Sequence, residues 1–326
     1  MVVDKMRVLL PALGFLTFIG HIAAPILHAK DRDSRQAIAW CYVHKGPLEL
    51  ERKVIGRRTT SLTLDRGALL PVLRTESKNG RQRALVHVTD LSTLNPVEGW
   101  VDASQAEISP LDRFPSDQEL LRQLGSEYQD DFSASKVKIP RWLVKEGDSG
   151  TALVCLLASV ALPVSRLVAF LPAQENFTRG PWLEFPFSEM KPGIVSCEVR
   201  DLLGDGIECL ITHEPFRKGP EVLGVNFVIR RLEAGKFRTL WTAPLEYRNL
   251  EIFPSEPQIH QPLEKNIGVP GTVTKAEVEF QQRGNITIPV WKATVEFFAV
   301  GRDKPLKSVK VTKACKWNGF EFEALQ

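Results

Sequence analysis

Short runs of β-branched and other apolar residues, separated by turn residues, follow one another along most of the 326-residue chain. In residues 84–88 (Ala-Leu-Val-His-Val) the apolar residues recur near a period of two, which is typical of a half-buried strand. Asn79 and Gly80 mark a hairpin, because this pair tolerates the positive φ angles of a type I′ turn. With one convincing helix signal among so many strand signals, the sequence predicts an all-β fold.

The strand signals fall into two groups on either side of a polar stretch at residues 111–135. That stretch contains one helix signal, in which Ser116 and Glu119 have the spacing of a capping box. We therefore expect β-rich domains at 36–110 and 136–326, joined by a linker with one helix. Strands are expected at 37–43, 61–64, 68–75, 83–89, 98–102, 152–159, 167–171, 194–199, 207–213, 223–232, 237–243, 272–280, 288–300, 309–312 and 316–323.

The N-terminus has the composition of a secretory leader. Lys5 and Arg7 precede an apolar run at residues 8–27, and Ala29 stands just before a charged stretch. This order of basic, apolar and small residues predicts a signal peptide at residues 1–29, cleaved near Ala29. The run is about as long as a membrane-spanning helix, ~20 residues, so an uncleaved anchor is the alternative. We expect a periplasmic or secreted chain, which would meet a membrane only if the leader stays on.

The overall composition excludes one large class of partner. The apolar fraction of 43% and the charged fraction of 25% are ordinary for a globular protein. The net charge is only +3, whereas nucleic-acid-binding domains carry a clear basic excess. We therefore expect no nucleic-acid partner.

Two short motifs in the first group of strands occur together. Residues 64–73 fit the pattern L-x-x-G-x-x-x-x-V-L in its glycine and apolar positions, and residues 98–102 read Glu-Gly-Trp-Val-Asp. Together they resemble a bacterial SH3-like domain covering residues 36–110. The resemblance implies a small barrel that often binds cell-wall or peptide ligands. Trp100 is then either part of the barrel core or part of a ligand groove.

An acidic turn stands between two expected strands of the second group. Asp201, Asp205 and Glu208 are spaced as in the D-x-[DN]-x-D-G loop of FG-GAP-type β-propeller repeats, which they resemble. Calcium prefers six or more oxygen ligands, so the resemblance implies a calcium site at these three residues. Leu203 replaces an oxygen ligand of the family pattern. The loop is therefore either a weak calcium site or a structural turn without a cofactor.

Two further segments, at 231–237 and 316–322, each place a glycine-containing turn before an aromatic residue. They resemble hairpins that accompany such acidic loops in exported proteins. About 190 residues hold at most three or four propeller blades of ~40–50 residues each. A closed propeller, an incomplete one and a sandwich all remain open for residues 136–326.

The five cysteines include no C-x-x-C pair, so a zinc or thioredoxin-like site is not indicated. Cys197 and Cys209 stand symmetrically about Leu203. If the turn between them closes a hairpin, these two thiols face each other, and a disulfide between them is one interpretation.

Two other patterns suggest a protease and a second membrane span, and other residues speak against both. Residues 147–150 (Gly-Asp-Ser-Gly) match the nucleophile motif of chymotrypsin-like proteases, but no histidine stands in the setting that this mechanism needs. Residues 151–171 are apolar enough to suggest a second membrane span, yet Pro163 and Arg166 favour two buried strands instead.

These patterns predict an exported, non-enzymatic protein that binds ligands or acts as a scaffold at the cell envelope. One alternative is an accessory or targeting module of a cell-wall hydrolase. The other is an envelope protein anchored in the membrane by its uncleaved N-terminal helix.

Overall fold

The structure is a computed structural model that describes residues 37–44, 46, 48–52, 62–124, 137–147, 150–158, 164–173, 176–186, 193–218, 222–249, 271–299 and 304–324. The expected leader at 1–29 and most of the linker after residue 124 lie outside these ranges. So do residues 148 and 149 of the protease-like motif.

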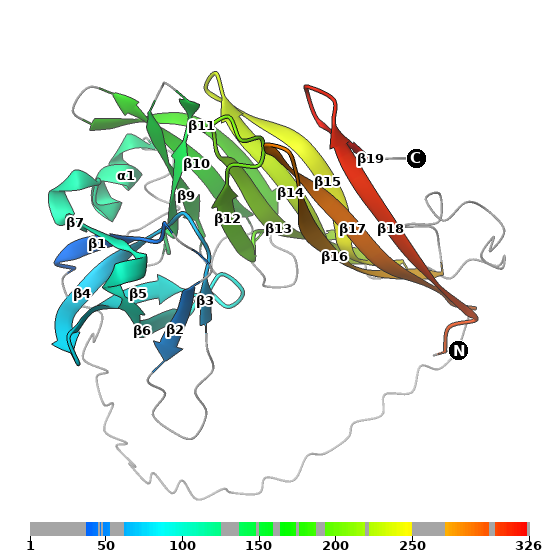
Figure 1. Ribbon diagram of the computed structural model, residues 1–326, viewed down its shortest axis with the longest axis horizontal. Helices are drawn as coiled ribbons and strands as arrows, with labels where there is room; N and C mark the ends of the chain where they lie inside the picture. The colour runs from blue at the N-terminus through cyan, green and yellow to red at the C-terminus, as the bar shows by residue number, and fades with distance from the viewer. Residues whose placement is uncertain are drawn as a thin grey trace, which may run out of the picture. The chain divides into compact units, whose positions relative to one another are not determined.

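The described residues confirm the all-β prediction, with two antiparallel sheets and one short α-helix (Figure 1). The first sheet has 11 strands and the second has eight. The first comprises β1 (Ala39–Tyr42), β2 (Leu48–Arg52), β3 (Leu62–Leu64), β4 (Ala68–Lys78), β5 (Arg81–Thr89), β6 (Pro96–Asp102), β7 (Glu107–Pro110), β8 (Arg141–Lys145), β9 (Thr151–Leu157), β10 (Val164–Ala173) and β11 (Asn176–Pro186). The second comprises β12 (Ser196–Arg200), β13 (Cys209–Lys218), β14 (Val222–Glu233), β15 (Lys236–Asn249), β16 (Thr272–Arg283), β17 (Ile286–Phe297), β18 (Lys307–Trp317) and β19 (Phe322–Ala324).

The first sheet continues across the expected domain boundary. Its order is β11-β10-β9-β8-β4-β5-β6-β2-β3, and β1 lies between β4 and β7. β4 from the SH3-like segment pairs with β8 from beyond the linker, with Ala68 opposite Trp142. Residues Gln36–Gln326 accordingly form one compact unit. The expected division within 111–135 is therefore corrected, since the change from one sheet to the other falls between β11 and β12.

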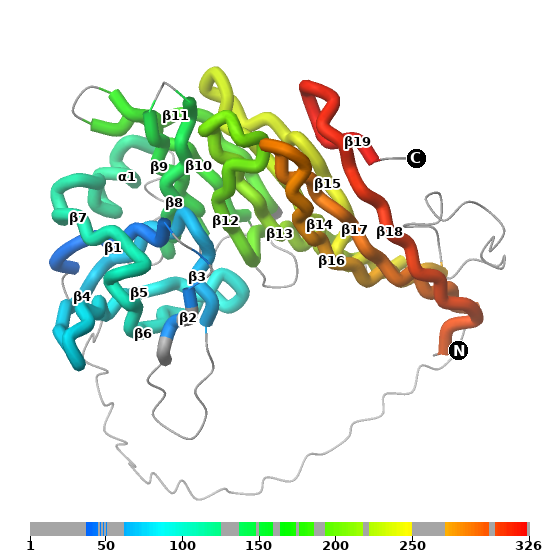
Figure 2. The backbone as a smooth tube through the Cα atoms, viewed as in Figure 1, coloured from blue at the N-terminus to red at the C-terminus, as the bar shows by residue number. Residues whose placement is uncertain are grey.

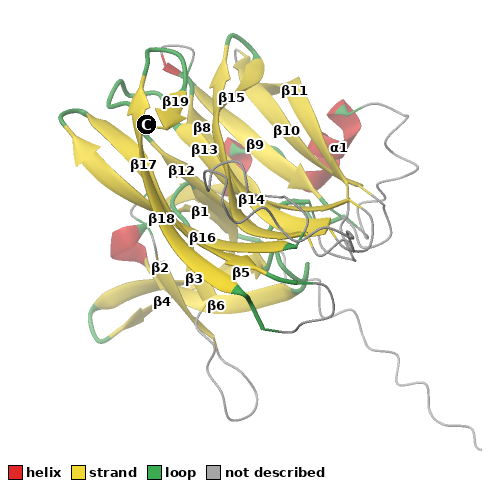
Figure 3. Cartoon of the chain, turned by 90° about the vertical axis from the view of Figure 1, so that its right-hand side faces the viewer, coloured by secondary structure: helices red, strands yellow, loops and turns green. Residues whose placement is uncertain are grey.

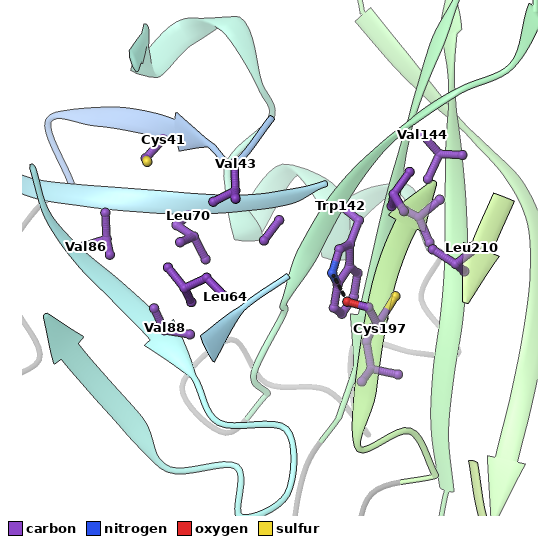
Figure 4. Packing of buried hydrophobic residues seen from close by; sticks show 14 of the residues in the cluster. Cys41, Val43, Leu64, Leu70, Val86, Val88, Trp142, Val144, Cys197 and Leu210 are labelled. Atoms are coloured by element: carbon purple, nitrogen blue, oxygen red, sulfur yellow. Dashed lines mark hydrogen bonds between the residues drawn. The ribbon is translucent and has the colours of Figure 1, made fainter. Parts of the chain in front are cut away.

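Turn residues 65–67, between β3 and β4, join the two sheets together with β8. The indole N–H of Trp142 donates a hydrogen bond of 3.1 Å to the Cys197 carbonyl, as Figure 4 shows. The Val199 N–H donates to the Arg66 carbonyl at 3.0 Å. Val144 and Leu210 belong to the same buried cluster although they come from different sheets. We call this region the sheet junction.

The predicted helix α1 (Asp117–Gln123) has the expected capping box, since Ser116 accepts from the Glu119 N–H and Glu119 accepts from the Ser116 N–H. The sequence did not indicate how the helix is held on the sheet. The buried guanidinium of Arg141 donates to the Pro115 carbonyl at 2.5 Å and pairs with Asp117. It also lies 4.5 Å from the ring centre of Trp40, where a cation–π contact adds to the attachment.

The second sheet is a simple meander in which β12 to β19 follow in chain order, as the backbone trace of Figure 2 shows. β15 and β16 share only four residue pairs, beginning at Glu246 opposite Lys275. Residues from both sides of this short pairing meet in one buried cluster, and the Thr287 N–H donates to the Leu202 carbonyl at 2.7 Å. The sheet therefore folds over on itself at this point (Figure 3). Propeller blades are separate sheets, whereas these eight described strands form one sheet. The structure therefore does not confirm a propeller, which stays a prediction.

Most expected strands are present, and the apolar stretch at 151–171 forms the two antiparallel strands β9 and β10. Among the described residues, no helix has the length and apolarity needed to cross a membrane. β2, β7, β8 and β11 were not expected. In β11, Gly180 and Pro181 suggest a turn, but they lie beside an irregularity in the pairing with β10 between Val168 and Phe170.

At the sheet junction, the close approach of Val199 leaves no room for a side chain at residue 67. A Cβ atom there would lie 2.4 Å from Val199 Cγ2, and the φ angle is +92°. Gly80, in the β4–β5 hairpin, also has a positive φ of +75° but no heavy atom within 4 Å of such a Cβ. We expect Gly80→Ala to cost about 1 kcal/mol of unfolding free energy from backbone strain alone. Gly67→Ala should cost about 1–3 kcal/mol more, because the methyl group overpacks the junction.

Urea denaturation of the two variants measures this difference. Equal losses in the two variants would show that the junction does not constrain residue 67.

Candidate functional site

Trp100 lies on the outer face of β6, away from the core. Along this strand Gly99 and Val101 are buried, whereas Trp100 and Asp102 are half-exposed. A strand turns alternate side chains to opposite faces, so Trp100 and Asp102 share the outer face. Of the two interpretations of Trp100, the structure favours a groove residue over a core residue.

Two arginines from neighbouring strands lie against the Trp100 ring. The guanidinium carbon of Arg74 on β4 is 5.0 Å from the ring centre, and that of Arg83 on β5 is 5.6 Å away. The strand register explains this arrangement, since Trp100 is opposite Leu85 and Leu85 is opposite Arg74. Each cation–π contact at a partly exposed site contributes about 0.5–1 kcal/mol. The ring therefore helps to fix the position of both guanidinium groups.

The predicted hairpin extends the positive surface at the end of β5. Asn79 and Gly80 have φ angles of 54° and 75°, as a type I′ turn requires. The turn brings Lys78 opposite Arg81. Arg81 and Arg83 are two residues apart on β5, so their side chains leave the same face of the sheet.

These elements line an open groove with a volume of about 630 Å³. We call it the Trp100 groove, and its lining residues are Leu48, Lys78, Asn79, Arg81, Arg83, Trp100, Val101, Asp102 and Gln105. The lining holds three cationic side chains and one carboxylate, so its net charge is +2. Such a surface attracts anions and offers several hydrogen-bond donors.

The carboxylate of the groove is fixed in its ionised form. The Ser104 N–H donates to Asp102 Oδ1 at 2.9 Å, and this bond begins the short 3₁₀ helix η1 (Ala103–Gln105). Hydrogen bonds from Ser104 lower the pKa of Asp102, and the nearby charges of Arg81 and Arg83 lower it further. The negative charge of Asp102 is therefore constant around neutral pH.

The acidic turn at 201–206 is closed by its own backbone. Asp201 accepts the Gly204 N–H at 2.7 Å and the Gly206 N–H at 2.9 Å, one with each carboxylate oxygen. Asp205 forms an ion pair with Arg231, a buried residue of β14. Burial would raise the pKa of Asp205, but the Arg231 guanidinium and the backbone lower it below its usual value.

Glu208 faces the sheet junction and not the acidic turn. Its carboxylate accepts from Arg66 at 3.1 Å and from the Lys145 N–H at 2.8 Å. The structure therefore does not gather Asp201, Asp205 and Glu208 around one point. No group of three or more metal-ligating residues occurs within the described ranges. For Asp205, the guanidinium of Arg231 supplies the positive charge that a metal ion would bring.

Leu203, which replaces an expected ligand, is a core residue. It is 9% exposed and belongs to the buried cluster of the second sheet together with Leu202, Cys209 and Ile288. An acidic residue at 203 would place a charge in this cluster, which is costly.

The disulfide interpretation of Cys197 and Cys209 is wrong, since both thiols are free. The hairpin is centred beyond Leu203, so Cys197 is opposite Thr212 and Cys209 is opposite Arg200. The two cysteines also point to opposite faces of the sheet, one into the sheet junction cluster and one into the second-sheet cluster. Burial raises the pKa of the Cys209 thiol to about 12.

Sequence reasoning identified Trp100 but missed the cations around it. Arg74 and Arg83 belong to no motif, and they meet the ring only through the register of β4, β5 and β6. The hairpin signal at Asn79 and Gly80 was enough to set the β4–β5 register, so it could have located these cations.

Asp65 gives the sheet junction a pH dependence. Burial and the nearby charge of Glu198 raise the pKa of Asp65 to about 6, although Arg200 lowers it. The usual pKa of an aspartate in an unfolded chain is about 3.9, so the folded state holds the proton more tightly. Stability from this group is full below about pH 4 and is lost as the pH rises to about 6.

We expect Asp65→Asn to raise the unfolding free energy at pH 7 by about 1–2 kcal/mol and to change it little at pH 4. Asp112→Asn, at an exposed carboxylate, is the matched control. Urea denaturation at both pH values tests the effect, and an Asp65→Asn variant that is less stable at pH 7 would contradict it.

A scan against protein-family models, and searches of curated proteins and of solved structures, found no significant match to this chain. The SH3-like and FG-GAP-like resemblances stay predictions.

Proposed function

We propose that this chain is an exported, non-enzymatic binding protein of the cell envelope and that its ligand occupies the Trp100 groove. The observation that carries the proposal is the position of Trp100. Its ring is half-exposed in an open groove, between two guanidinium groups and beside further cations.

The groove has the rigidity that a binding site needs. Its floor and walls come from β4, β5 and β6, which are hydrogen-bonded to one another over most of their lengths. The type I′ turn and the η1 cap both lie at one end of these strands, since Lys78 is opposite Arg81 and Arg83 is opposite Asp102. A site on such elements keeps its side chains in place before the ligand arrives, which reduces the entropy cost of binding.

The rest of the chain supports a scaffolding role. The sheet junction joins the first sheet to the second, and the acidic turn is closed by internal hydrogen bonds. These features hold the groove on a larger β-rich body. The basic, apolar and small residues of the leader support export.

The export part of the proposal predicts the length of the mature chain. Protein recovered from the periplasm or the medium should lack about the first 29 residues, because signal peptidases cut after small residues such as Ala29. Intact-mass measurement tests this. A full-length species in the membrane fraction would favour the anchored alternative.

The binding part of the proposal predicts a loss in Trp100→Ala. The mature chain should co-sediment with cell-envelope material from its source cells. The variant should bind about thirtyfold more weakly, because it loses the ring that positions the guanidinium groups of Arg74 and Arg83, and truncation of a central aromatic residue costs about 2 kcal/mol.

Trp182→Ala is the matched control. Trp182 is also partly exposed and has the guanidinium of Arg166 at 5.6 Å, but it lies on β11 outside the groove. Thermal unfolding of both variants separates lost binding from lost folding. Equal co-sedimentation of Trp100→Ala and the native chain would overturn the proposal.

A further inference from the structure

We propose that the ligand of the Trp100 groove is an acidic polysaccharide, whose carboxylate or phosphate groups bind the arginines while its hydroxyl groups bind the neutral side chains. This inference rests on the proposed function and names the ligand class for the same site. Four features support it: the charge of the groove, its neutral lining residues, the strand pairing and the guanidinium groups that lie on the indole ring.

The charge of the groove calls for an anion. Among its lining residues, the three cations Lys78, Arg81 and Arg83 outnumber the one carboxylate, that of Asp102, and Glu76 lies opposite Arg83 on the neighbouring strand β4. A guanidinium group presents N–H donors in a planar fork that matches a carboxylate or a phosphate. Hydrogen bonds from Ser104 and the nearby charges of Arg81 and Arg83 lower the pKa of Asp102, so this carboxylate stays ionised at neutral pH beside the three cationic side chains of the lining.

The spacing of the cations favours a polymer over a small anion. Arg81 and Arg83 lie on one face of β5, two residues apart, which is about 7 Å along a strand. Lys78 lies opposite Arg81 on β4, so the three cations form a cluster that is two strands wide. A groove of about 630 Å³ is also much larger than a single phosphate group needs. A chain with an acidic group on successive units meets several of these cations at once.

The neutral lining favours a sugar. Asn79 and Gln105 are exposed amides in the same groove, and each offers both hydrogen-bond donors and an acceptor. Sugar hydroxyl groups also donate and accept, so they match amides well.

The strand pairing and the ring argue against two other acidic polymers. β5 is hydrogen-bonded to β4 on one side and to β6 on the other, so the groove offers no free strand edge to a peptide. Single-stranded nucleic acids bind mainly by stacking bases on exposed aromatic rings. The Trp100 ring already carries the guanidinium groups of Arg74 and Arg83.

Isothermal titration of the mature chain with defined polymers tests the inference. Polygalacturonate should bind, and its affinity should fall as the salt concentration rises. Dextran, a neutral glucose polymer, should not bind. Arg83→Gln should weaken binding about tenfold or more through loss of a charge-assisted contact. Arg166→Gln is the matched control. In the native chain the Arg166 guanidinium lies 5.6 Å from the Trp182 ring, the same distance as Arg83 from Trp100, and its loss should leave binding unchanged.

A variant that is expected to bind more tightly gives the sharpest test. Asp102→Asn keeps a capping acceptor for the Ser104 N–H but removes the one carboxylate of the groove. We expect polygalacturonate to bind this variant several-fold more tightly.

The remaining outcomes separate the inference from the proposed function. Binding of polyglutamate or of a single-stranded oligonucleotide as tightly as polygalacturonate would overturn the assignment to a polysaccharide. Binding of dextran would overturn the role of charge. If no acidic polysaccharide binds while Trp100-dependent co-sedimentation with envelope material persists, the inference fails and the proposed function stands.

Discussion

The contact between the turn at Asp65, Arg66 and Gly67 and the strand β12 holds the two sheets together. Val199 can approach this turn because residue 67 has no side chain, and its N–H then reaches the Arg66 carbonyl. Glu208 completes the contact, since its carboxylate takes one bond from Arg66 and one from the Lys145 backbone. Removing either partner would leave a largely buried carboxylate with fewer donors, which is costly. This small region is one of the places where the buried cluster passes from one sheet to the other.

Local signals predicted local structure well. The capping box at Ser116 and the Asn79-Gly80 turn are set by residues that are neighbours in the chain, and both form as expected. The pairing of β4 with β8 and the folding of the second sheet at β15 and β16 join residues far apart in the chain. No local pattern encodes such pairings, so the domain boundary and the propeller were beyond what the sequence could establish. The same holds for the candidate site. A local motif predicted Trp100, whereas Arg74 and Arg83 beside its ring became apparent only from the strand register.

The acidic turn carries the partners of its two aspartates within the chain. Asp201 closes the turn through two backbone N–H groups, and Asp205 is neutralised by the buried Arg231. Arg231 is part of the chain, so the positive charge beside Asp205 is present whatever ions surround the protein. Leu203 packs in the buried cluster of the second sheet.

The continuity of the first sheet has a mechanical consequence for a protein that holds a ligand. β4 is bonded to β5 near the Trp100 groove and to β8 near the sheet junction. If the Trp100 groove holds a ligand as proposed, a force on that ligand passes from β5 to β4 and on to β8, where two residue pairs join the strands. The short pairing of β4 with β8 is then the place along this route where the load is concentrated.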